Sequence, residues 1–467
     1  MSFVKIEDGD TICALSTASG VGGIAVLRVS GPRALAFCRK LCSFLPVEAD
    51  SHRVYYGYLK SLVEQDQIDE VLVTYFAEGR SFTGEETVEI SCHGGEVTTS
   101  LILKELVKVG CRMARRGEFT YRAFMNGRLD LVQAESVLGL IESQSKQSAK
   151  MALRQLQGHL SQDFGVIEDQ LVWMLAHLEA SIDFSTEDLE VVSSDELIQR
   201  SRSLSGHLER LIDSYNRGRL IKDGFFVALI GSPNAGKSSL LNAILNEEKA
   251  IVTPIAGTTR DLIEGKVLIK GFPVTFIDTA GLREASDEVE KIGISRSHKA
   301  MNEADLTLYI SDLNSPNWEE ELTGFLANRN RDSLFVIFNK IDLDSEGDLN
   351  ARSRQLLENM GFALNRAFWV SATRRVGLEA IEETLAKLVD RVNSETSSVV
   401  TQARHLELLQ KIYRCLTTSV ELMSKETSPE FIAFELQEAV HAIHEILGKE
   451  FDEQVIDRIF KEFCLGK

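Results

Sequence analysis

One loop constrains the fold of this chain more than any other feature, the stretch GSPNAGKS at residues 231–238. It matches the spacing G-x-x-x-x-G-K-[ST], follows an apolar run at 225–230 and precedes a helical pattern at 239–245. In such a loop the backbone N–H groups and the helix dipole face an anion. Lys237 can reach the β- and γ-phosphates of a nucleotide, and the Ser238 hydroxyl can ligate Mg²⁺. The loop therefore predicts a phosphate site, with a glycine-rich turn before an ordinary helix as the alternative.

Further motifs follow the loop in the order that a GTP-binding domain requires: GTTRD at 257–261, DTAG at 278–281, NKID at 339–342 and SAT at 371–373. Threonines and a carboxylate can complete a Mg²⁺ site, and a glycine can sense the γ-phosphate. The aspartate of NKID can accept the N1 and N2 hydrogens of guanine, which adenine lacks, so the motifs predict GTP rather than ATP. The predicted nucleotide contacts are Asn234, Ala235, Gly236, Lys237, Ser238, Ser239, Thr258, Thr259, Asp278, Gly281, Asn339, Lys340, Asp342, Ser371 and Ala372.

The residue that follows the DTAG motif is unusual for a GTPase. It is Leu282, where many GTPases have a glutamine that positions the attacking water. An apolar side chain cannot orient water, so either another group does so or hydrolysis is slow. Charged residues follow closely, and each taken singly is explained more simply as a solvated side chain; they are Arg283, Glu284, Asp287, Glu288 and Glu290.

The 467 residues separate into segments of different pattern. Residues 1–118 are typical of a compact α+β unit, and residues 119–216 and 386–467 show long helical patterns. Residues 217–385 alternate strands and helices, which predicts a mostly parallel sheet with helices on both faces. The simplest architecture inserts this nucleotide domain into a discontinuous all-α domain. Its strands are expected at 225–230, 266–269, 274–277, 306–310, 334–338 and 368–370.

Composition adds further limits. The formal net charge of −19 argues against a general nucleic-acid-binding protein, because phosphate binding depends on cationic surface. No apolar run is long enough to span a membrane, and seven scattered cysteines suit reduced thiols in the cytoplasm. No proline occurs between Pro46 and Pro233, which favours one uninterrupted helix over 151–180. A local basic patch remains open, with a solvated charged face as its alternative; its arginines are Arg112, Arg115, Arg116, Arg122 and Arg128.

These motifs carry a resemblance to one family. The stretches GSPNAGKSS, PIAGTTRD, DTAGLREASDEVE, NKID and the terminal FCLGK resemble the MnmE (TrmE) family of tRNA uridine-modifying GTPases. So do DTICALSTASGVGGIAVLRVSG, SFTGEETVEISCHGG and RRGEFTYRAFMNGRLDLVQAE nearer the N-terminus, and the resemblance covers essentially the whole chain. It implies an N-terminal tetrahydrofolate-binding and dimerisation domain, a helical domain in two parts and an inserted P-loop GTPase domain.

The resemblance also implies cofactors and partners. The chain would form a homodimer and, with the FAD-dependent flavoprotein MnmG (GidA), a heterotetramer. Together they would install an aminomethyl or carboxymethylaminomethyl group at C5 of the wobble uridine of tRNA. GTP, Mg²⁺, K⁺ and a tetrahydrofolate derivative that supplies one carbon would be the cofactors, and no membrane would be involved.

Site residues carried over from the family fall into groups. The K⁺ ligands would be Asn234, Thr253, Ile255 and Thr258, and the Mg²⁺ ligands Ser238 and Thr259. The catalytic residues would be Glu290, which acts on water where Leu282 cannot, Lys237 on the phosphates, and Cys464 for the modification. The folate contacts would be Arg28, Glu89, Arg128 and Lys467. In general chemistry, a cation suits the folate's glutamate tail and a carboxylate suits the N–H edge of its pterin.

Two other functions stay open from the residues alone. A GTP switch for ribosome assembly is one, because other GTPases with a GTTRD loop have that role. In the other, the N-terminal and helical regions serve only as a dimerisation scaffold. The folate-type motifs and the terminal FCLGK favour tRNA modification over the switch, since an assembly switch needs neither.

Overall fold

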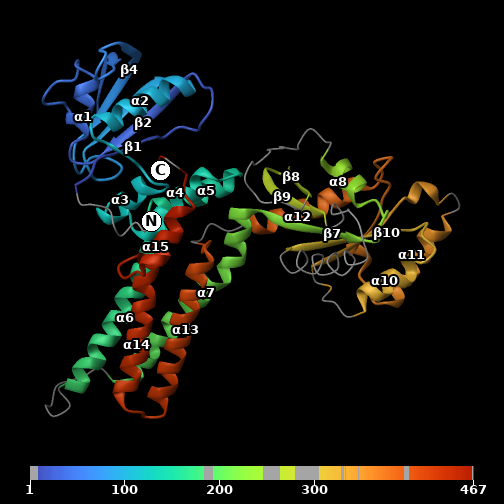
Figure 1. The fold of residues 1–467 in the computed structure, drawn as a ribbon. Coiled ribbons are helices and arrows are strands. Elements are labelled where there is room, and N and C mark those ends of the chain that lie inside the picture. The colour runs from blue at the N-terminus through green and yellow to red at the C-terminus, as the bar shows by residue number, and fades with distance from the viewer. Residues whose placement is uncertain are drawn as a thin grey trace, which may run out of the picture. The chain divides into compact units, whose positions relative to one another are not determined.

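A computed structural model describes residues 9–183, 193–245, 263–278, 304–327, 331, 333–344, 347–393, 399–464 and 466 of the protein (Figure 1). The chain divides into two units. The first comprises residues 1–142, 150–214 and 398–467, and the second comprises residues 143–149 and 215–397. Among the described residues, no helix combines the length and apolar character that crossing a membrane requires.

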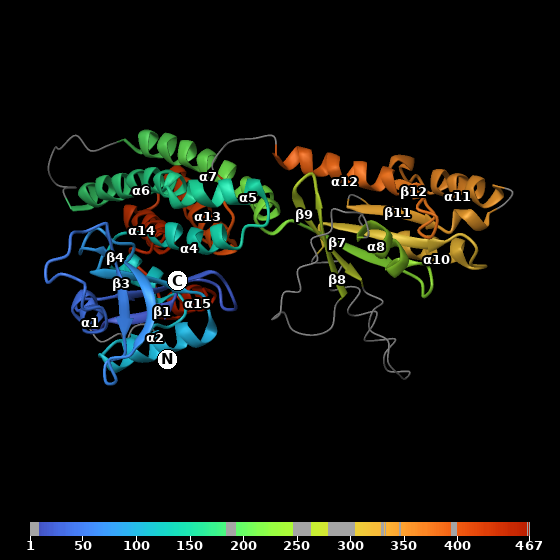
Figure 2. The same cartoon turned by 90° about the horizontal axis from the view of Figure 1, so that it is seen from above.

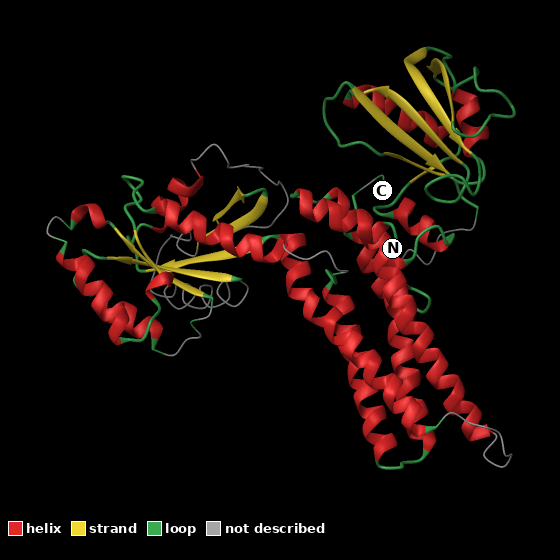
Figure 3. Ribbon diagram, turned by 180° about the vertical axis from the view of Figure 1, so that it is seen from behind, coloured by secondary structure: helices red, strands yellow, loops and turns green. Residues whose placement is uncertain are grey.

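A six-stranded sheet forms the N-terminal part of the first unit (Figure 3). Its order is β3-β4-β5-β2-β1-β6, and all neighbours are antiparallel except β1 and β6. One face buries Leu27, Val73 and Ile90 against Leu106 of the second helix. The strands are β1 (Ile12–Leu15), β2 (Ile24–Ser30), β3 (Arg53–Lys60), β4 (Gln67–Phe76), β5 (Thr87–His93) and β6 (Arg112–Met113), and the helices are α1 (Ala34–Leu41) and α2 (Glu96–Lys108).

The rest of the first unit is helical, and α6, α13 and α14 pack side by side along their length. The predicted single helix over 151–180 is wrong, because the chain breaks between α5 and α6 at Gly158, whose φ is +88°. Gln133 donates from Nε2 to the Leu156 carbonyl at 2.9 Å and so binds the end of α5. These helices are α3 (Glu118–Met125), α4 (Leu131–Ile141), α5 (Lys146–Leu156), α6 (His159–Asp183), α7 (Ser194–Asp223), α13 (Ala403–Ser424), α14 (Pro429–Leu447) and α15 (Glu453–Lys461). The start of α5 up to residue 149 and the end of α7 from residue 215 are assigned to the second unit.

A buried cluster of charged side chains joins the two sequence-distant parts of the helical region. Glu135 of α4 accepts from Arg404 Nε at 3.1 Å, and its Oε2 lies 2.8 Å from Nε2 of His405, both on α13. Arg404 also donates to the Glu445 carbonyl at the end of α14 at 2.9 Å. Burial alone would raise the pKa of the Glu135 carboxyl, but the charges of His405 and Arg404 outweigh it and lower the pKa to about 2.

The chain enters the long segment 215–397 of the second unit and returns from it at neighbouring points of the first unit. Ser214, near the boundary at which the chain passes into the second unit, accepts a hydrogen bond on Oγ from the backbone N–H of Val400 at 3.1 Å. The carbonyl of Val399 accepts from Gln155 Nε2 at 2.9 Å. The two crossing points therefore belong to one small region of the helical bundle.

The second unit is a six-stranded sheet in the order β12-β11-β10-β7-β9-β8, parallel except for the pair β8–β9 (Figure 2). Both faces are buried, because successive residues of β7 such as Val227, Ala228 and Leu229 are all inaccessible. The strands are β7 (Phe225–Gly231), β8 (Ile263–Ile269), β9 (Phe272–Asp278), β10 (Leu306–Asp312), β11 (Leu334–Asn339) and β12 (Ala367–Trp369); the helices are α8 (Lys237–Leu245), α10 (Trp318–Leu326), α11 (Asp348–Asn359) and α12 (Leu378–Asn393).

All six predicted strands of this unit are present, each within a few residues of its expected bounds. The boundary expected at residue 385 falls inside α12, which contacts β8, and the second unit continues to 397. In the strand order, β7 has β9 on one side and β10 on the other, so the connections leave β7 in both directions. The carboxyl ends of strands at such a reversal form the binding crevice of open parallel sheets.

Candidate functional site

The phosphate loop joins the end of β7 to the start of α8, and glycine is required at both of its ends. Gly231 has φ +154°, and a Cβ there would lie 2.0 Å from the Ile310 carbonyl oxygen. Gly236 has φ +95°, and a Cβ there would lie 2.1 Å from Asn339 Nδ2. Asn234 is left-handed with φ +66°, a conformation that asparagine tolerates better than most residues. The loop thus has the backbone turn that the sequence predicts.

The lysine of the loop is buried against the loop itself. Lys237 is 6% exposed, and its ammonium donates to the carbonyls of Gly231 at 2.6 Å and Ser232 at 2.8 Å. The ammonium group therefore lies across the loop, where the backbone N–H groups of the turn also gather. A phosphate bound in the loop would meet this cation directly, which fits the predicted role of Lys237.

Asn339 joins three of the predicted motifs. It is 2% exposed; its Nδ2 donates to the Ala235 carbonyl in the phosphate loop at 2.9 Å, and its Oδ1 accepts from the Ala372 N–H at 3.1 Å. Asn339 ends β11, and its register partner Asp312 ends the neighbouring β10. One amide side chain therefore fixes the distance between the loop, NKID and SAT.

The base end of the site presents an acceptor without a partner. Oδ1 of Asp342 is buried, and no described residue donates a hydrogen bond to it. The Ser371 hydroxyl is the largest cause of a lowered pKa for Asp342, with the charges of Arg374 and Lys340 adding to it. Arg374 Nε lies 3.7 Å from Asp342 Oδ2. An ionised carboxylate with an unused buried oxygen fits the donor edge of guanine.

Several predicted site residues lie outside the described residues. They are Thr253, Ile255, Thr258, Thr259, Gly281, Glu290 and Lys467, and the same holds for the side chain of Asp278. The described members of the predicted nucleotide site are brought together at the carboxyl ends of β7, β11 and β12. Ser238 and Ser239 stand in the first turn of α8.

A second candidate site lies in the N-terminal sheet. Arg28 and Glu89 are register partners on β2 and β5, and Arg28 donates to Glu89 Oε1 from Nε at 2.9 Å and from NH2 at 2.8 Å. The guanidinium carbon lies 5.4 Å from the ring centroid of Phe82 and 5.5 Å from that of Phe119. Arg128 donates to the carbonyl of the neighbouring Ser81 at 3.3 Å. Arg28 and Arg128 therefore contact the neighbouring residues Phe82 and Ser81, and Glu89 joins this group through Arg28.

The last residues of the chain dock on the same domain. The Phe463 carbonyl accepts from Arg116 Nε at 2.9 Å, and the Gly466 carbonyl accepts from Ser16 Oγ at 3.1 Å. Gly466 has φ +89°, and a Cβ there would meet the Leu15 carbonyl at 2.0 Å, so the approach requires glycine. Between these anchors Cys464 is exposed, whereas the other six cysteines are buried.

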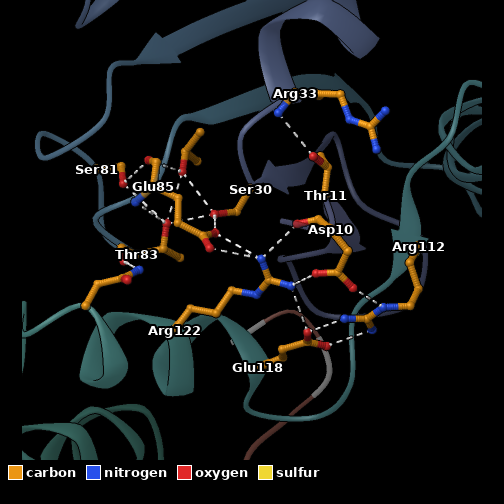
Figure 4. A network of polar contacts seen from close by, with 12 residues as sticks. Asp10, Thr11, Ser30, Arg33, Ser81, Thr83, Glu85, Arg112, Glu118 and Arg122 are labelled. Atoms are coloured by element: carbon orange, nitrogen blue, oxygen red, sulfur yellow. Dashed lines mark hydrogen bonds and ion pairs between the residues drawn. The ribbon is translucent and has the colours of Figure 1, made fainter. Parts of the chain in front are cut away.

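The hypothesis of a basic patch fails for two of its arginines, as Figure 4 shows. Arg122 is 5% exposed and binds Asp10 and Glu85, and Arg112 binds Asp10 at 2.6 Å and Glu118 at 2.5 Å. Burial raises the pKa values of Asp10 and Glu118, but hydrogen bonds from the arginines reverse this and lower both pKa values. Two cations among three carboxylates cannot form a cationic surface, so these arginines hold the domain together.

Sequence reasoning missed three residues of these sites. Phe82 flanks Arg28, and Asp312 and Asn314 contact Lys340. Phe82 lies in the quoted stretch SFTGEE and could have been suspected from it. The signal for Asp312 was weaker, a carboxylate at the end of the strand YISD that precedes the NKID strand.

Two family models match the chain, one over its N-terminal part and one over most of the rest. The family model described as the MnmE helical domain matches residues 131–464, and the model described as the GTP-binding protein TrmE N-terminus matches residues 11–128. A protein of Bdellovibrio bacteriovorus named tRNA modification GTPase MnmE is 48% identical, covering 99% of this chain and 98% of that protein. A protein of the same name from Alkaliphilus oremlandii is 38% identical, covering 98% of this chain and 99% of that protein. Among solved structures, the G domain of the T. maritima FeoB iron transporter is 26% identical over 35% of this chain and 98% of that chain, with a TM-score of 0.26.

Proposed function

The chain belongs to the MnmE family of tRNA modification GTPases, and from this premise we propose that its GTP hydrolysis depends on K⁺ and serves a folate-dependent modification of tRNA. With an FAD-dependent partner of the MnmG type, it installs the aminomethyl or carboxymethylaminomethyl group at C5 of the wobble uridine. The carbon comes from a tetrahydrofolate derivative. Its free thiols suit the reducing cytoplasm in which we place it.

The observation that carries the GTP site is the group formed by Asn339 and Asp342. Asn339 ties the phosphate loop to SAT, so a nucleotide held by the loop has its base near the unused Oδ1 of Asp342. Ser238 and Thr259 would hold Mg²⁺ beside the phosphates. The metal would neutralise negative charge on the phosphate oxygens. Lys237 neutralises the same oxygens by a point charge.

We assign Asn234 to the K⁺ site, together with oxygen atoms of Thr253, Ile255 and Thr258. Its place in the phosphate loop supports this, because Asn234 directly precedes Ala235 there and takes the left-handed backbone conformation, with φ +66°. A cation there supplies positive charge where negative charge develops during hydrolysis. Glu290 acts on the attacking water, a role that Leu282 cannot fill. Two copies of the GTPase domain complete the arrangement across their switch loops.

Replacing K⁺ with Na⁺ is expected to slow GTP hydrolysis at least about tenfold, because a site sized for K⁺ holds the smaller Na⁺ poorly and the positive charge at the transition state is then lost. The measurement is phosphate release at saturating GTP and constant ionic strength. Asn234→Ala should hydrolyse GTP equally slowly in both salts while binding GDP normally. Asn246→Ala is the matched control, because Asn246 lies outside the phosphate loop in the sequence. Equal rates in both salts for the wild type would refute the K⁺ assignment.

The ion pair between Arg28 and Glu89 limits which part of the folate each of these two residues can contact. Arg28 and Glu89 are 2.8 Å apart, so they cannot hold the opposite ends of one extended folate. We therefore assign Glu89, oriented by Arg28, to the N–H edge of the pterin. Arg128 and Lys467 remain for the glutamate tail, whose carboxylates need cations. Cys464, exposed on the docked C-terminus, is the residue that we assign to the modification itself.

Glu89→Gln is expected to weaken binding of 5-formyltetrahydrofolate at least about tenfold, because a charge-assisted hydrogen bond becomes a neutral one. Titration calorimetry on the full chain measures this, and the GTP hydrolysis rate should not change. Glu78→Gln, at an exposed position of the same domain, is the control and should bind the folate normally. Normal folate binding by the Glu89 variant would remove this residue from the site.

The homodimer has a suitable surface in the N-terminal sheet. On the face opposite the helices, Val54, Tyr56 and Tyr58 of β3 are 56%, 62% and 45% exposed, and Leu72 of β4 is 48% exposed. Tyr56 and Leu72 are register partners, so these side chains form one apolar patch. Exposed apolar patches of this kind mark interaction sites, and we propose that a second copy of the chain covers this one.

A further inference from the structure

We propose that Asp312 and Asn314 are positioning residues for guanine nucleotides, which act by fixing Lys340 beside the base. Nothing in the sequence motifs assigns them a role, because Asp312 ends β10 and Asn314 lies in the loop that follows, about 26 residues before NKID. The proposal rests on the guanine site described above and concerns the residues that hold its lysine.

Lys340 needs external support because of its backbone conformation. Its φ is +65°, a left-handed value that costs a residue with a Cβ on the order of 1–2 kcal/mol of conformational free energy. The residue stands between Asn339, which ties the phosphate loop, and the short helical turn Ile341–Leu343, which carries Asp342. Any relaxation at Lys340 would therefore turn Asp342 away from the base.

Asp312, at the end of β10, and Asn314, in the loop that follows, bind Lys340 at its ammonium and at its carbonyl. The Lys340 ammonium donates to Asp312 Oδ2 at 2.6 Å, and the Lys340 carbonyl accepts from Asn314 Nδ2 at 3.2 Å. The other oxygen of Asp312 accepts from the Asn314 N–H at 3.0 Å, so the two residues also hold each other. Both the ammonium and the backbone carbonyl of Lys340 are therefore held by neighbouring side chains.

The sheet explains why Asp312 is in place. β10 and β11 are parallel neighbours, and Asp312 is the register partner of Asn339 at their carboxyl ends. The Leu313 N–H donates to the Asn339 carbonyl at 3.4 Å, which extends the pairing one residue further. The carboxylate side chain is only 17% exposed, so solvent screens the ion pair less than it would at the surface.

These contacts preorganise the base end of the site. A lysine that is free to rotate must be ordered when nucleotide binds, and this ordering weakens affinity. With Asp312 and Asn314 present, the ordering is complete before binding. The benefit is the same for GDP and GTP, because the contacts lie at the base and not at the γ-phosphate.

The test is Asp312→Asn in the full chain, which keeps the size of the side chain and removes its charge. Kd for GDP and KM for GTP should both rise about fivefold, while kcat at saturating GTP and the melting temperature without nucleotide stay unchanged. In a Lys340→Met background, Asp312→Asn should have no further effect, because the lysine through which it acts is gone. The control is Asp390→Asn, which breaks the exposed pair with Lys270 in the same unit and should leave Kd unchanged.

Three results would overturn the proposal: an unchanged or tighter Kd, an effect on GTP alone, or additive effects in the double variant. Asp342→Asn separates this outcome from failure of the guanine site itself. If that variant still prefers GDP to ADP as strongly as the wild type does, the assignment of the guanine site is wrong. If it loses the preference while Asp312→Asn behaves as wild type, only the positioning role is wrong.

Discussion

Gly236→Ala should weaken binding of GDP by about a hundredfold or more. The added Cβ would lie 2.1 Å from Asn339 Nδ2, a distance that no pair of non-bonded atoms tolerates. Asn339 would have to move, and it would lose its hydrogen bonds to Ala235 and Ala372, each worth about 1 kcal/mol. The alanine would also hold φ near +95°, which adds about 1–2 kcal/mol. Fluorescence titration with a labelled GDP measures the loss.

A second glycine provides the control for this variant. Gly271 has φ +76°, but a Cβ there meets nothing within 4 Å, so Gly271→Ala carries the backbone cost without the collision. It should bind GDP within about threefold of the wild type, since its turn lies between β8 and β9. If both variants bind equally, the collision with Asn339 does not matter and the joining role of Asn339 is wrong.

Glu135→Ala is expected to lower the free energy of unfolding of the helical region by about 3–5 kcal/mol. The carboxylate is 9% exposed and bound by two neighbouring side chains of α13, so its removal leaves Arg404 and His405 buried without their counter-charge. Urea unfolding followed by circular dichroism measures the change. Glu196→Ala is the control. The side chains of Glu196 and Arg200 are 45% and 44% exposed, so their ion pair contributes at most about 0.5 kcal/mol to stability. Equal losses for the two variants would contradict the structural role.

The same carboxylate predicts how stability depends on pH. Its pKa in the folded protein is about 2, lower than that of an unpaired glutamate in the unfolded chain. The unfolded chain therefore binds the proton first as the pH falls, and the stabilisation is complete above the unfolded pKa. It is lost progressively as the pH falls towards 2. Glu135→Gln should show a flatter dependence over this acid range, whereas an identical slope would show that other carboxylates account for it.

The nucleotide unit was predictable because its strands are local and apolar throughout. Every residue of Leu334–Phe338 is buried, so a continuous apolar run marks the strand without help from the rest of the chain. β6 was not predictable, because two residues carry no period and the strand exists only through pairing with β1. The break at Gly158 was also hidden, since a single glycine is tolerated within helices and only the contact with Gln133 shows the turn.

The candidate sites divide in the same way. Asn339 and Asp342 are three residues apart in a contiguous motif, so the sequence alone is enough to predict guanine recognition by these residues. The pair of Arg28 and Glu89 depends on strand register between residues 61 positions apart, and no motif states that they touch. Nothing in the sequence indicated that Arg112 and Arg122 are paired, because their carboxylate partner Asp10 is up to 112 positions away along the chain.

The neighbouring crossing points at Ser214 and Val400 have a consequence for how this chain came to exist. A genetic segment that encodes 215–397 could enter or leave the gene without pulling apart the two ends of the host bundle, which are already linked by a hydrogen bond. A short linker of a few glycines would close the gap. The GTPase segment is therefore separable in structural terms, and a chain that lacks it could still close its helical bundle.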